Sequence, residues 1–273
     1  MADAAESLLG RLGLQGRMAL VTGAGAGLGQ AIAHSLAALG ARVAVLDLQA
    51  KAAEETAASL PGQGHLVLPC DVADGAAVQR SVEQVCQQAG RLDIVVNSAG
   101  VTCRPGMPFT NNTDADWNRV WDINVKGAVH VCGAARQALI ESGNGRIVNL
   151  SSVVGVISAP YMPPYTVSKA ALISLTKVLA RELAEHHITV NAVCPGFIWT
   201  PLWQDLGERM AAHDRQSQGH SAREVFEGRV RQHVPMQRPQ TSQDVADAVA
   251  FLCSGAASNI TGQVIGIDGG VTI

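Results

Sequence analysis

Short apolar runs alternate along the chain with longer segments whose apolar residues recur every three or four positions. Short runs bounded by turn residues indicate buried strands, and the longer spacing indicates helices. The expected strands are 18–22, 42–47, 65–70, 93–97, 146–151, 188–193 and 264–267. The expected helices are 28–39, 51–60, 76–89, 114–140, 163–186 and 243–252, with 114–140 as one long helix.

Strands that alternate with helices predict an α/β fold with right-handed crossovers. We therefore expect a doubly wound parallel sheet of about seven strands with helices on both faces. Residues 1–16 are expected to be an N-terminal extension, and residues 17–273 a single domain. The segment of about 197–239 is polar and poorly periodic, which predicts a long lid or binding loop.

Composition narrows the class of protein. The chain has 273 residues, is 47% hydrophobic and 16% charged, and carries a formal net charge of −3. No basic cluster indicates nucleic acid, and no apolar run is long enough to span a membrane. The six cysteines form no CxxC pair and the histidines show no metal-ligand spacing, so we expect reduced thiols, no metal and a cytoplasmic protein.

A glycine-rich turn, Thr22–Gly29, follows the first strand and opens the first helix. Glycines allow a sharp turn and close approach of a pyrophosphate, which the free N–H groups of the helix then bind. This context predicts a dinucleotide-binding Rossmann fold. Asp47 ends the second strand, where a carboxylate accepts hydrogen bonds from the adenosine ribose and repels a 2′-phosphate. No Lys or Arg stands in the turn or at Leu48, so NAD is favoured over NADP as the cofactor.

Tyr165 and Lys169 are four residues apart, so on a helix their side chains share a face. An ammonium near a phenol favours the phenolate, which otherwise forms only near pH 10. Ser152 lies 13 positions before Tyr165. The neighbouring Ser151 does not have this spacing. Tyr161 has no lysine four residues later and is interpreted as a pocket residue.

In chain order these motifs resemble the short-chain dehydrogenase/reductase family, in its single-domain branch, from Met18 to Gly270. The resemblance rests on TGAGAGLG at 22–29, the adenine-contacting segment 70–72, NSAG at 97–100, Asn124, the Ser152, Tyr165 and Lys169 spacing, Pro195-Gly196 with Thr200, and the ending Asp268–Gly270. Ser98 is a departure, since the family usually has NNAG there.

The resemblance implies an oxidoreductase with Asn124, Ser152, Tyr165 and Lys169 as catalytic residues. Tyr165 would exchange a proton with the substrate, Lys169 would lower its pKa and bind the nicotinamide ribose, Ser152 would hold the substrate oxygen, and Asn124 would position a water. The implied cofactor-binding residues are Gly23, Gly25, Gly27, Leu28, Gly29, Asp47, Leu48, Asp71, Val72, Asn97, Ala99, Gly100, Tyr165, Lys169, Pro195, Gly196, Ile198 and Thr200.

The expected substrate is a small or medium neutral secondary alcohol or its ketone, such as a hydroxyketone, diol or sugar alcohol. The expected pocket has no cluster of arginines to hold an anion. Its substrate residues are Ser152, Val154, Tyr161, Trp199 and Trp203, with Val153, Cys103, Met162, Phe197 and Leu202 beside them. One alternative is a 3-oxoacyl-(acyl-carrier-protein) or acyl-CoA reductase. A more remote alternative is a catalytically silent NAD-sensing protein.

The family usually forms tetramers, so a homotetramer is expected here as well. The helices expected at 114–140 and 163–186 carry apolar residues on more than one face, including Val129 and Leu175. One face can cover the sheet while another packs against a second copy.

Overall fold

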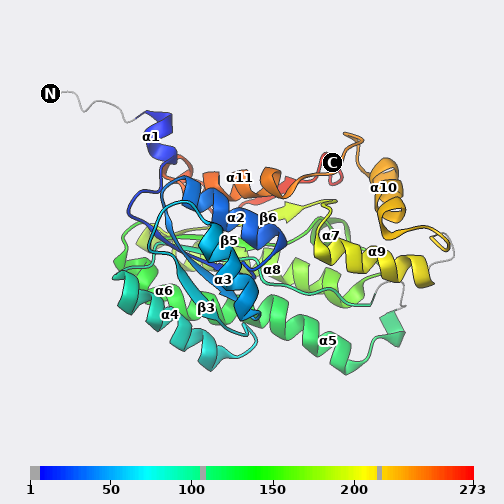
Figure 1. Ribbon diagram of the computed structural model, residues 1–273, viewed down its shortest axis with the longest axis horizontal. Helices are drawn as coiled ribbons and strands as arrows, with labels where there is room; N and C mark the ends of the chain where they lie inside the picture. The colour runs from blue at the N-terminus through cyan, green and yellow to red at the C-terminus, as the bar shows by residue number, and fades with distance from the viewer. Residues whose placement is uncertain (1–6, 105–108, 214–216) are drawn as a thin grey trace.

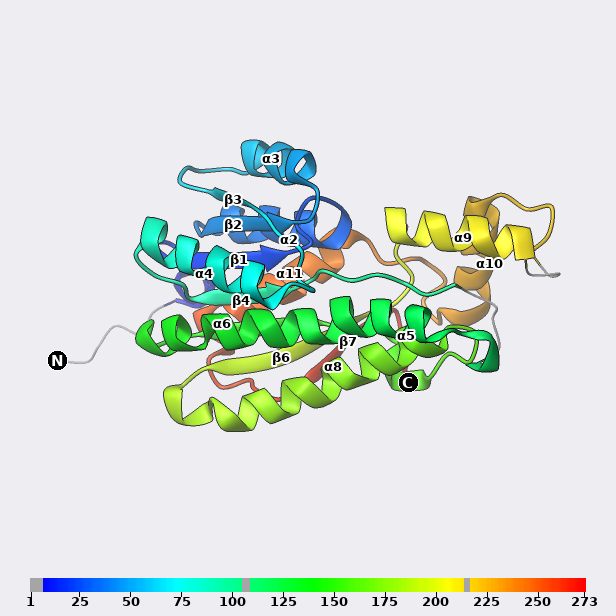
Figure 2. The same cartoon turned by 90° about the horizontal axis from the view of Figure 1, so that it is seen from below.

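A single parallel sheet forms the centre of the molecule (Figures 1 and 2). The computed structural model describes residues 7–104, 109–213 and 217–273. Within these residues the sheet has seven strands in the order β3-β2-β1-β4-β5-β6-β7. The strands are β1 Met18–Thr22, β2 Arg42–Asp47, β3 Leu66–Pro69, β4 Ile94–Asn97, β5 Arg146–Leu150, β6 Thr189–Pro195 and β7 Val264–Ile267. The predicted fold class is confirmed.

Helices cover both faces of the sheet, as Figure 2 shows. One face packs against α2 (Gly27–Ala38), α3 (Ala50–Ser59) and α11 (Ser242–Cys253). The opposite face packs against α4 (Gly75–Ala89), α6 (Gly127–Glu141) and α8 (Pro163–Glu182). Because both faces are covered, the central strands β1, β4 and β5 are buried along their whole length.

The strand order reverses beside β1, and this determines where a ligand can bind. Strand β1 pairs with β2 on one side and with β4 on the other, with Leu20 next to both Ala44 and Val95. The connections leave these strands in opposite directions, so a crevice opens beyond their carboxyl ends.

The segment predicted as one helix at 114–140 is divided, so that prediction was wrong in detail. It consists of α5 (Asp114–Trp121), a π-helical turn (Asp122–Lys126) and α6. The N–H of Gly127 donates to the carbonyl of Asp122, five residues back. The apolar pattern does not reveal the extra residue in this turn, because a π turn leaves the spacing on either side unchanged.

The predicted irregular loop at 197–239 is also wrong for most of its length. It contains α9 (Pro201–His213) and α10 (Ala222–His233), which lie beyond the carboxyl end of the sheet (Figures 1 and 2). Residues 214–216, between the two helices, are outside the described residues. Ser221 and Glu224 form a reciprocal capping box at the start of α10. This signature was present in the sequence and could have revealed the helix.

Two smaller helices complete the fold. Helix α7 (Val154–Ile157) follows β5, and α1 (Leu8–Leu12) lies within the segment expected as an extension. Leu14, just after α1, is fully buried and packs into the core on the α2 face. Short 3-10 turns at Phe109–Asn111, Ala184–His186 and Gly255–Ala257 join the longer elements.

Candidate active site

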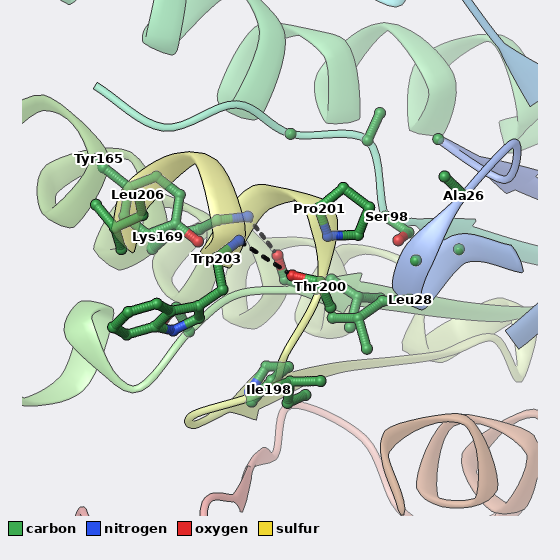
Figure 3. A pocket seen from close by; sticks show the side chains of 18 of the residues that line it. Ala26, Leu28, Ser98, Tyr165, Lys169, Ile198, Thr200, Pro201, Trp203 and Leu206 are labelled. Carbon is green, nitrogen blue, oxygen red and sulfur yellow. Dashed lines mark hydrogen bonds between the residues drawn. The ribbon is translucent and has the colours of Figure 1, made fainter. Parts of the chain in front are cut away.

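A cavity of about 370 Å³ opens at the carboxyl ends of the central strands (Figure 3). One end is formed by the glycine turn and Asp47, and the other by residues after β5 and β6. Of the predicted cofactor residues, those that line it are Gly23, Gly25, Gly27, Leu28, Gly29, Asp47, Ala99, Gly100, Tyr165, Lys169, Pro195, Gly196, Ile198 and Thr200. The structure therefore brings most of the predicted cofactor set into one space.

The glycine turn is packed so closely that larger residues do not fit. A Cβ on Gly23, whose φ is +63°, would lie 2.8 Å from Cα of Ala99. A Cβ on Gly25 would lie 2.9 Å from the Asp47 carboxylate. The N-cap of α2, Ala26, provides no side-chain hydrogen bond, so the first N–H groups of the helix are left for another acceptor.

The Asp47 carboxylate is held in place by two backbone hydrogen bonds. One carboxylate oxygen accepts a hydrogen bond from the N–H of Gly25 at 2.8 Å, and the other accepts from Gln49 at 2.9 Å. Leu48 does not line the cavity, and its side chain is 70% exposed.

Three other predicted cofactor residues lie outside the cavity lining. Asp71 accepts a hydrogen bond from the N–H of Ala73, and Val72 is buried. The amide of Asn97 donates to Asn149 in the neighbouring strand at 2.8 Å. Asn97 therefore has a structural role, because its side chain joins β4 to β5.

Ser152, Tyr165 and Lys169 all line the cavity. Ser152 follows β5, while Tyr165 and Lys169 occupy the first turns of α8, whose first residue is a proline. The Lys169 ammonium lies 5.5 Å from the centre of the Tyr165 ring and donates a hydrogen bond to the carbonyl of Leu150 at 2.7 Å. The Ser152 hydroxyl, the Tyr165 phenol and the Lys169 ammonium therefore share one cavity.

The electrostatics of this group differ from the prediction that Lys169 lowers the pKa of Tyr165. Burial raises the pKa of Tyr165 to about 12, and a hydrogen bond with Ser152 acts in the opposite direction. Burial also lowers the pKa of Lys169 to about 8. The pKa values differ from the prediction because both groups are buried and burial has the largest effect on each.

Asn124 lies in the π-helical turn and is buried beside this group. Its oxygen accepts from the N–H of Val101 at 2.8 Å, and its NH₂ group donates to the Val101 carbonyl and to Ser168, each at 3.0 Å. A Cβ on Gly100 would lie 3.3 Å from the Asn124 oxygen and 3.5 Å from the Lys169 nitrogen. The glycine thus allows both groups to approach the same stretch of backbone.

Two serines that the sequence reasoning did not assign support the backbone around the site. The hydroxyl of Ser151 donates to the carbonyl of Lys169 at 2.7 Å, which joins the segment after β5 to α8. The hydroxyl of Ser168 donates to the carbonyl of Tyr165 within α8 at 2.7 Å and accepts a hydrogen bond from Asn124 in the π-helical turn. Both serines are buried. The sequence indicated their importance only by placing them next to Ser152 and Lys169.

The other end of the cavity is mostly apolar. Among the predicted substrate residues, Ser152, Val154, Tyr161 and Trp203 line it, together with Val153, Met162 and Phe197. Leu206, which the sequence reasoning did not single out, also lines it. The only charged residues that line the cavity within the described chain are Asp47 and Lys169.

Trp199 lies outside this lining, although the sequence placed it in the substrate pocket. Its ring packs edge-on against Phe226 at 5.2 Å, with the Arg223 guanidinium 5.0 Å from its centre. Cys103 is buried in a cluster with Met162 and does not line the cavity. The side chain of Leu202 is outside the described part of the structure.

The helices of the described residues lack the length and apolar character needed to cross a membrane. The same residues contain no group of His, Cys, Asp and Glu side chains arranged to hold a metal ion. The six cysteines are free thiols.

The doubly wound sheet, the glycine turn at its switch point and the phenol–ammonium pair define an α/β oxidoreductase that uses a nicotinamide cofactor. A family model described as Enoyl-(Acyl carrier protein) reductase matches residues 23–272. The chain belongs to the short-chain dehydrogenase/reductase family and is an oxidoreductase acting on CH–OH groups.

Relatives with different substrates resemble the chain to similar degrees. The 3-oxoacyl-(acyl-carrier-protein) reductase of Thermotoga maritima is 38% identical, over 95% of this chain and 99% of its own length. The (3R)-3-hydroxyacyl-CoA dehydrogenase of Rattus norvegicus is 38% identical, over 96% of this chain and 98% of its own length. A crystal structure of NAD⁺-bound xylitol dehydrogenase has a TM-score of 0.88 at 35% identity, over 94% of this chain and 99% of that one.

Proposed function

We propose that this protein interconverts a neutral secondary alcohol and its ketone, with NAD as the hydride acceptor. The observation that carries the proposal is that Ser152, Tyr165 and Lys169 line the same cavity as Asp47. Tyr165, supported by Ser152 and Lys169, can exchange a proton with a substrate, and Asp47 can bind an adenosine ribose.

The residues present fit a dinucleotide. The glycine turn leaves room where a Cβ would clash, and the uncapped start of α2 directs N–H groups toward a phosphate. Asp47 would accept hydrogen bonds from the ribose hydroxyls and would repel a 2′-phosphate, which favours NAD. Ile198 and Thr200 would hold the carboxamide. When bound, the nicotinamide supplies hydride transfer.

The chain's own residues would handle the proton and the substrate oxygen. In alcohol oxidation Tyr165 takes the hydroxyl proton, and in ketone reduction it returns that proton to the oxygen. Ser152 donates a hydrogen bond to the same oxygen and stabilises the charge that develops there. Lys169 would supply a positive charge that favours the phenolate and opposes the effect of burial on Tyr165.

Asn124 would act by positioning rather than by direct contact. Its carboxamide holds the backbone of Val101 and the hydroxyl of Ser168, which in turn is bonded to the carbonyl of Tyr165. A water held near Asn124 and Lys169 would carry protons onward to solvent, as the family resemblance implies.

Acyl-thioester reduction is the second candidate. Burial raises the pKa of the Tyr161 phenol, and the positive charge of Arg229 acts in the opposite direction, so a guanidinium lies within electrostatic reach of this cavity residue. Such a charge suits an anionic substrate, and two of the relatives act on acyl thioesters by name. The absence of an arginine from the described cavity lining favours the neutral substrate.

The test is NADH and NADPH formation with secondary alcohols, diols, sugar alcohols and 3-hydroxyacyl-CoA esters, with Tyr165→Phe as control. Turnover with NAD on a neutral alcohol, lost in the variant, is the expected result. Turnover restricted to thioesters would transfer the function to the second candidate. Tight NADH binding without any turnover would instead favour a silent NAD-sensing protein.

A cytoplasmic homotetramer is part of the same proposal. Val129 on α6 and Val178 on α8 are 46% and 57% exposed, which gives these helices an apolar outer face. Burial of that face between copies would remove apolar surface from water. Sedimentation as a monomer at micromolar concentration would contradict the tetramer.

A further inference from the structure

The aromatic residues after β6 form a connected cluster beside the cavity. Trp203 packs edge-on against Phe226 with ring centres 5.0 Å apart, and its ring lies 5.7 Å from that of Phe197. Phe226, on α10, is fully buried. Trp203 and Phe197 line the cavity, so the cluster presents part of its surface to a bound molecule (Figure 3).

Trp203 is held by its backbone as well as by its ring. The N–H of Trp203 donates to the hydroxyl of Thr200 at 3.3 Å, at the start of α9 (Figure 3). With the indole packed on Phe226 and the backbone tied to Thr200, the ring forms a wall that exists before any substrate binds.

Among the residues that the structure describes, few polar side chains are available at this end of the cavity. Ser152 and Tyr165 serve the reacting oxygen, and the Thr200 hydroxyl already accepts a hydrogen bond from Trp203. The phenol of Tyr161 and the indole N–H of Trp203 are the further donors there. Val154, Met162 and Leu206 offer only apolar surface. A polyol would bury several hydroxyls without partners, whereas a hydrocarbon body would lose no hydrogen bonds.

Size limits the substrate in the same direction. The cavity of about 370 Å³ includes the region of the glycine turn, so the dinucleotide would fill much of it. The space left beside Trp203 would therefore be smaller than 370 Å³, which favours a compact substrate.

We propose that the substrate is a compact, mainly apolar alcohol or ketone with one alicyclic or aromatic ring, and that Trp203 determines this preference. The inference rests on the proposed function and narrows it, because it disfavours the sugar alcohols and the thioesters. An aromatic ring can stack on or pack edge-on against an indole, and a compact alicyclic ring can bury apolar surface against it.

The experiment compares kcat/KM with NAD for matched pairs, cyclohexanol against myo-inositol and 1-phenylethanol against xylitol, with 3-hydroxybutyryl-CoA as a third class. We expect each ring alcohol to exceed its polyol partner by about tenfold or more, since buried unpaired hydroxyls weaken binding. Equal or better turnover of a polyol or of the thioester overturns this inference and leaves the oxidoreductase function in place. No turnover of any alcohol with NAD overturns both.

The role of Trp203 is tested by the ratio of cyclohexanol to myo-inositol kcat/KM. We expect Trp203→Ala to lower this ratio about tenfold, mainly through KM for cyclohexanol, and Trp203→Phe to keep most of it. General damage to the fold would lower both values together and leave the ratio unchanged. Trp121→Phe, on α5 and outside the cavity lining, is the matched control. An unchanged ratio in folded Trp203→Ala that still binds NADH overturns the assignment.

Discussion

The carboxylate of Asp47 is hydrogen bonded to the backbone N–H of Gly25 at 2.8 Å. This bond joins the end of β2 to the turn after β1, so the negative charge stands at a fixed place in the cavity. Gly25 must lack a side chain for the contact to form, because a Cβ there would lie 2.9 Å from the carboxylate.

The first prediction concerns cofactor choice. We expect Asp47→Ala combined with Leu48→Arg to shift the ratio of NADPH to NADH affinity by about tenfold or more, since a repulsive charge is replaced by an attractive one. Fluorescence titration of both reduced cofactors measures this. Glu54→Lys, at an exposed position of α3, changes the net charge by the same amount and is the charge-matched control. An unchanged ratio in the double variant would contradict the role of Asp47.

The second prediction distinguishes the two tyrosines. We expect Tyr165→Phe to lower kcat by about 10²–10⁴-fold, as loss of a general acid or base usually does, with NADH binding retained. Tyr161→Phe should change kcat by less than about tenfold and act mainly on KM, because this phenol lines the substrate end of the cavity. Steady-state kinetics with both variants decide the matter, and an inactive Tyr161→Phe would reverse the assignment.

The third prediction is a pH profile. Lys169 has a pKa of about 8 and Tyr165 a pKa of about 12 in the protein without ligands. For ketone reduction the phenol must be protonated and the ammonium charged, so kcat/KM should be level below pH 8 and fall above it. The fall should be absent from the residual activity of Lys169→Met. A reduction rate that rises between pH 7 and 9 would contradict this arrangement.

The fourth prediction is that the same lysine reduces stability. Its pKa is lowered from 10.5 to about 8 on folding, so the unfolded chain binds more protons between these values and stability rises with pH across that window. At pH 7 the penalty is fully present. We expect Lys169→Met to raise Tm by about 2–4 °C at pH 7, which corresponds to roughly 1 kcal/mol for a chain of this size. Calorimetry at pH 7 and 10 provides the check, and a lower Tm for the variant at pH 7 would count against it.

The fifth prediction concerns the helical pair α9 and α10. Phe226 is fully buried between Trp199 and Trp203, so Phe226→Ala should leave a cavity that costs about 3–5 kcal/mol. Because the cluster lies outside the sheet, we expect the loss to appear as faster hydrogen exchange in 201–213 and 222–233, with β1 and β4 unchanged. Uniformly faster exchange through the sheet would show that the helical pair is not a separate unit of stability.

The sequence predicted the parts of the fold that depend on buried strands. Runs such as Met18–Thr22 and the centre of Arg42–Asp47 are apolar enough to indicate buried strands of a parallel sheet without knowledge of contacts. It could not show the π-helical turn that carries Asn124, because the pattern on either side is helical. The polar surface of α9 and α10 concealed their periodicity, although the Ser221–Glu224 capping box was visible.

The candidate site was predicted from motifs, which give the positions of residues but not their surroundings. Spacing placed Tyr165 and Lys169 on one face of α8, which the structure shows. It gave the wrong direction for the pKa of Tyr165, because the effect of burial depends on surroundings that no local spacing reveals. Trp199 and Trp203 are four residues apart and both pack against Phe226, and only the structure shows that Trp203 lines the cavity whereas Trp199 does not.

The proton-handling groups and the aromatic wall come from different parts of the chain. Tyr165 and Lys169 belong to α8 and Ser152 to the segment after β5, whereas Trp203 and Phe226 belong to the helical pair after β6. The two parts meet in a hydrophobic cluster that contains Met162, Tyr165, Trp203 and Leu206. Residues 201–233 are therefore the natural region to diversify in laboratory evolution, since new ketones could be accommodated there while the hydride chemistry is inherited unchanged.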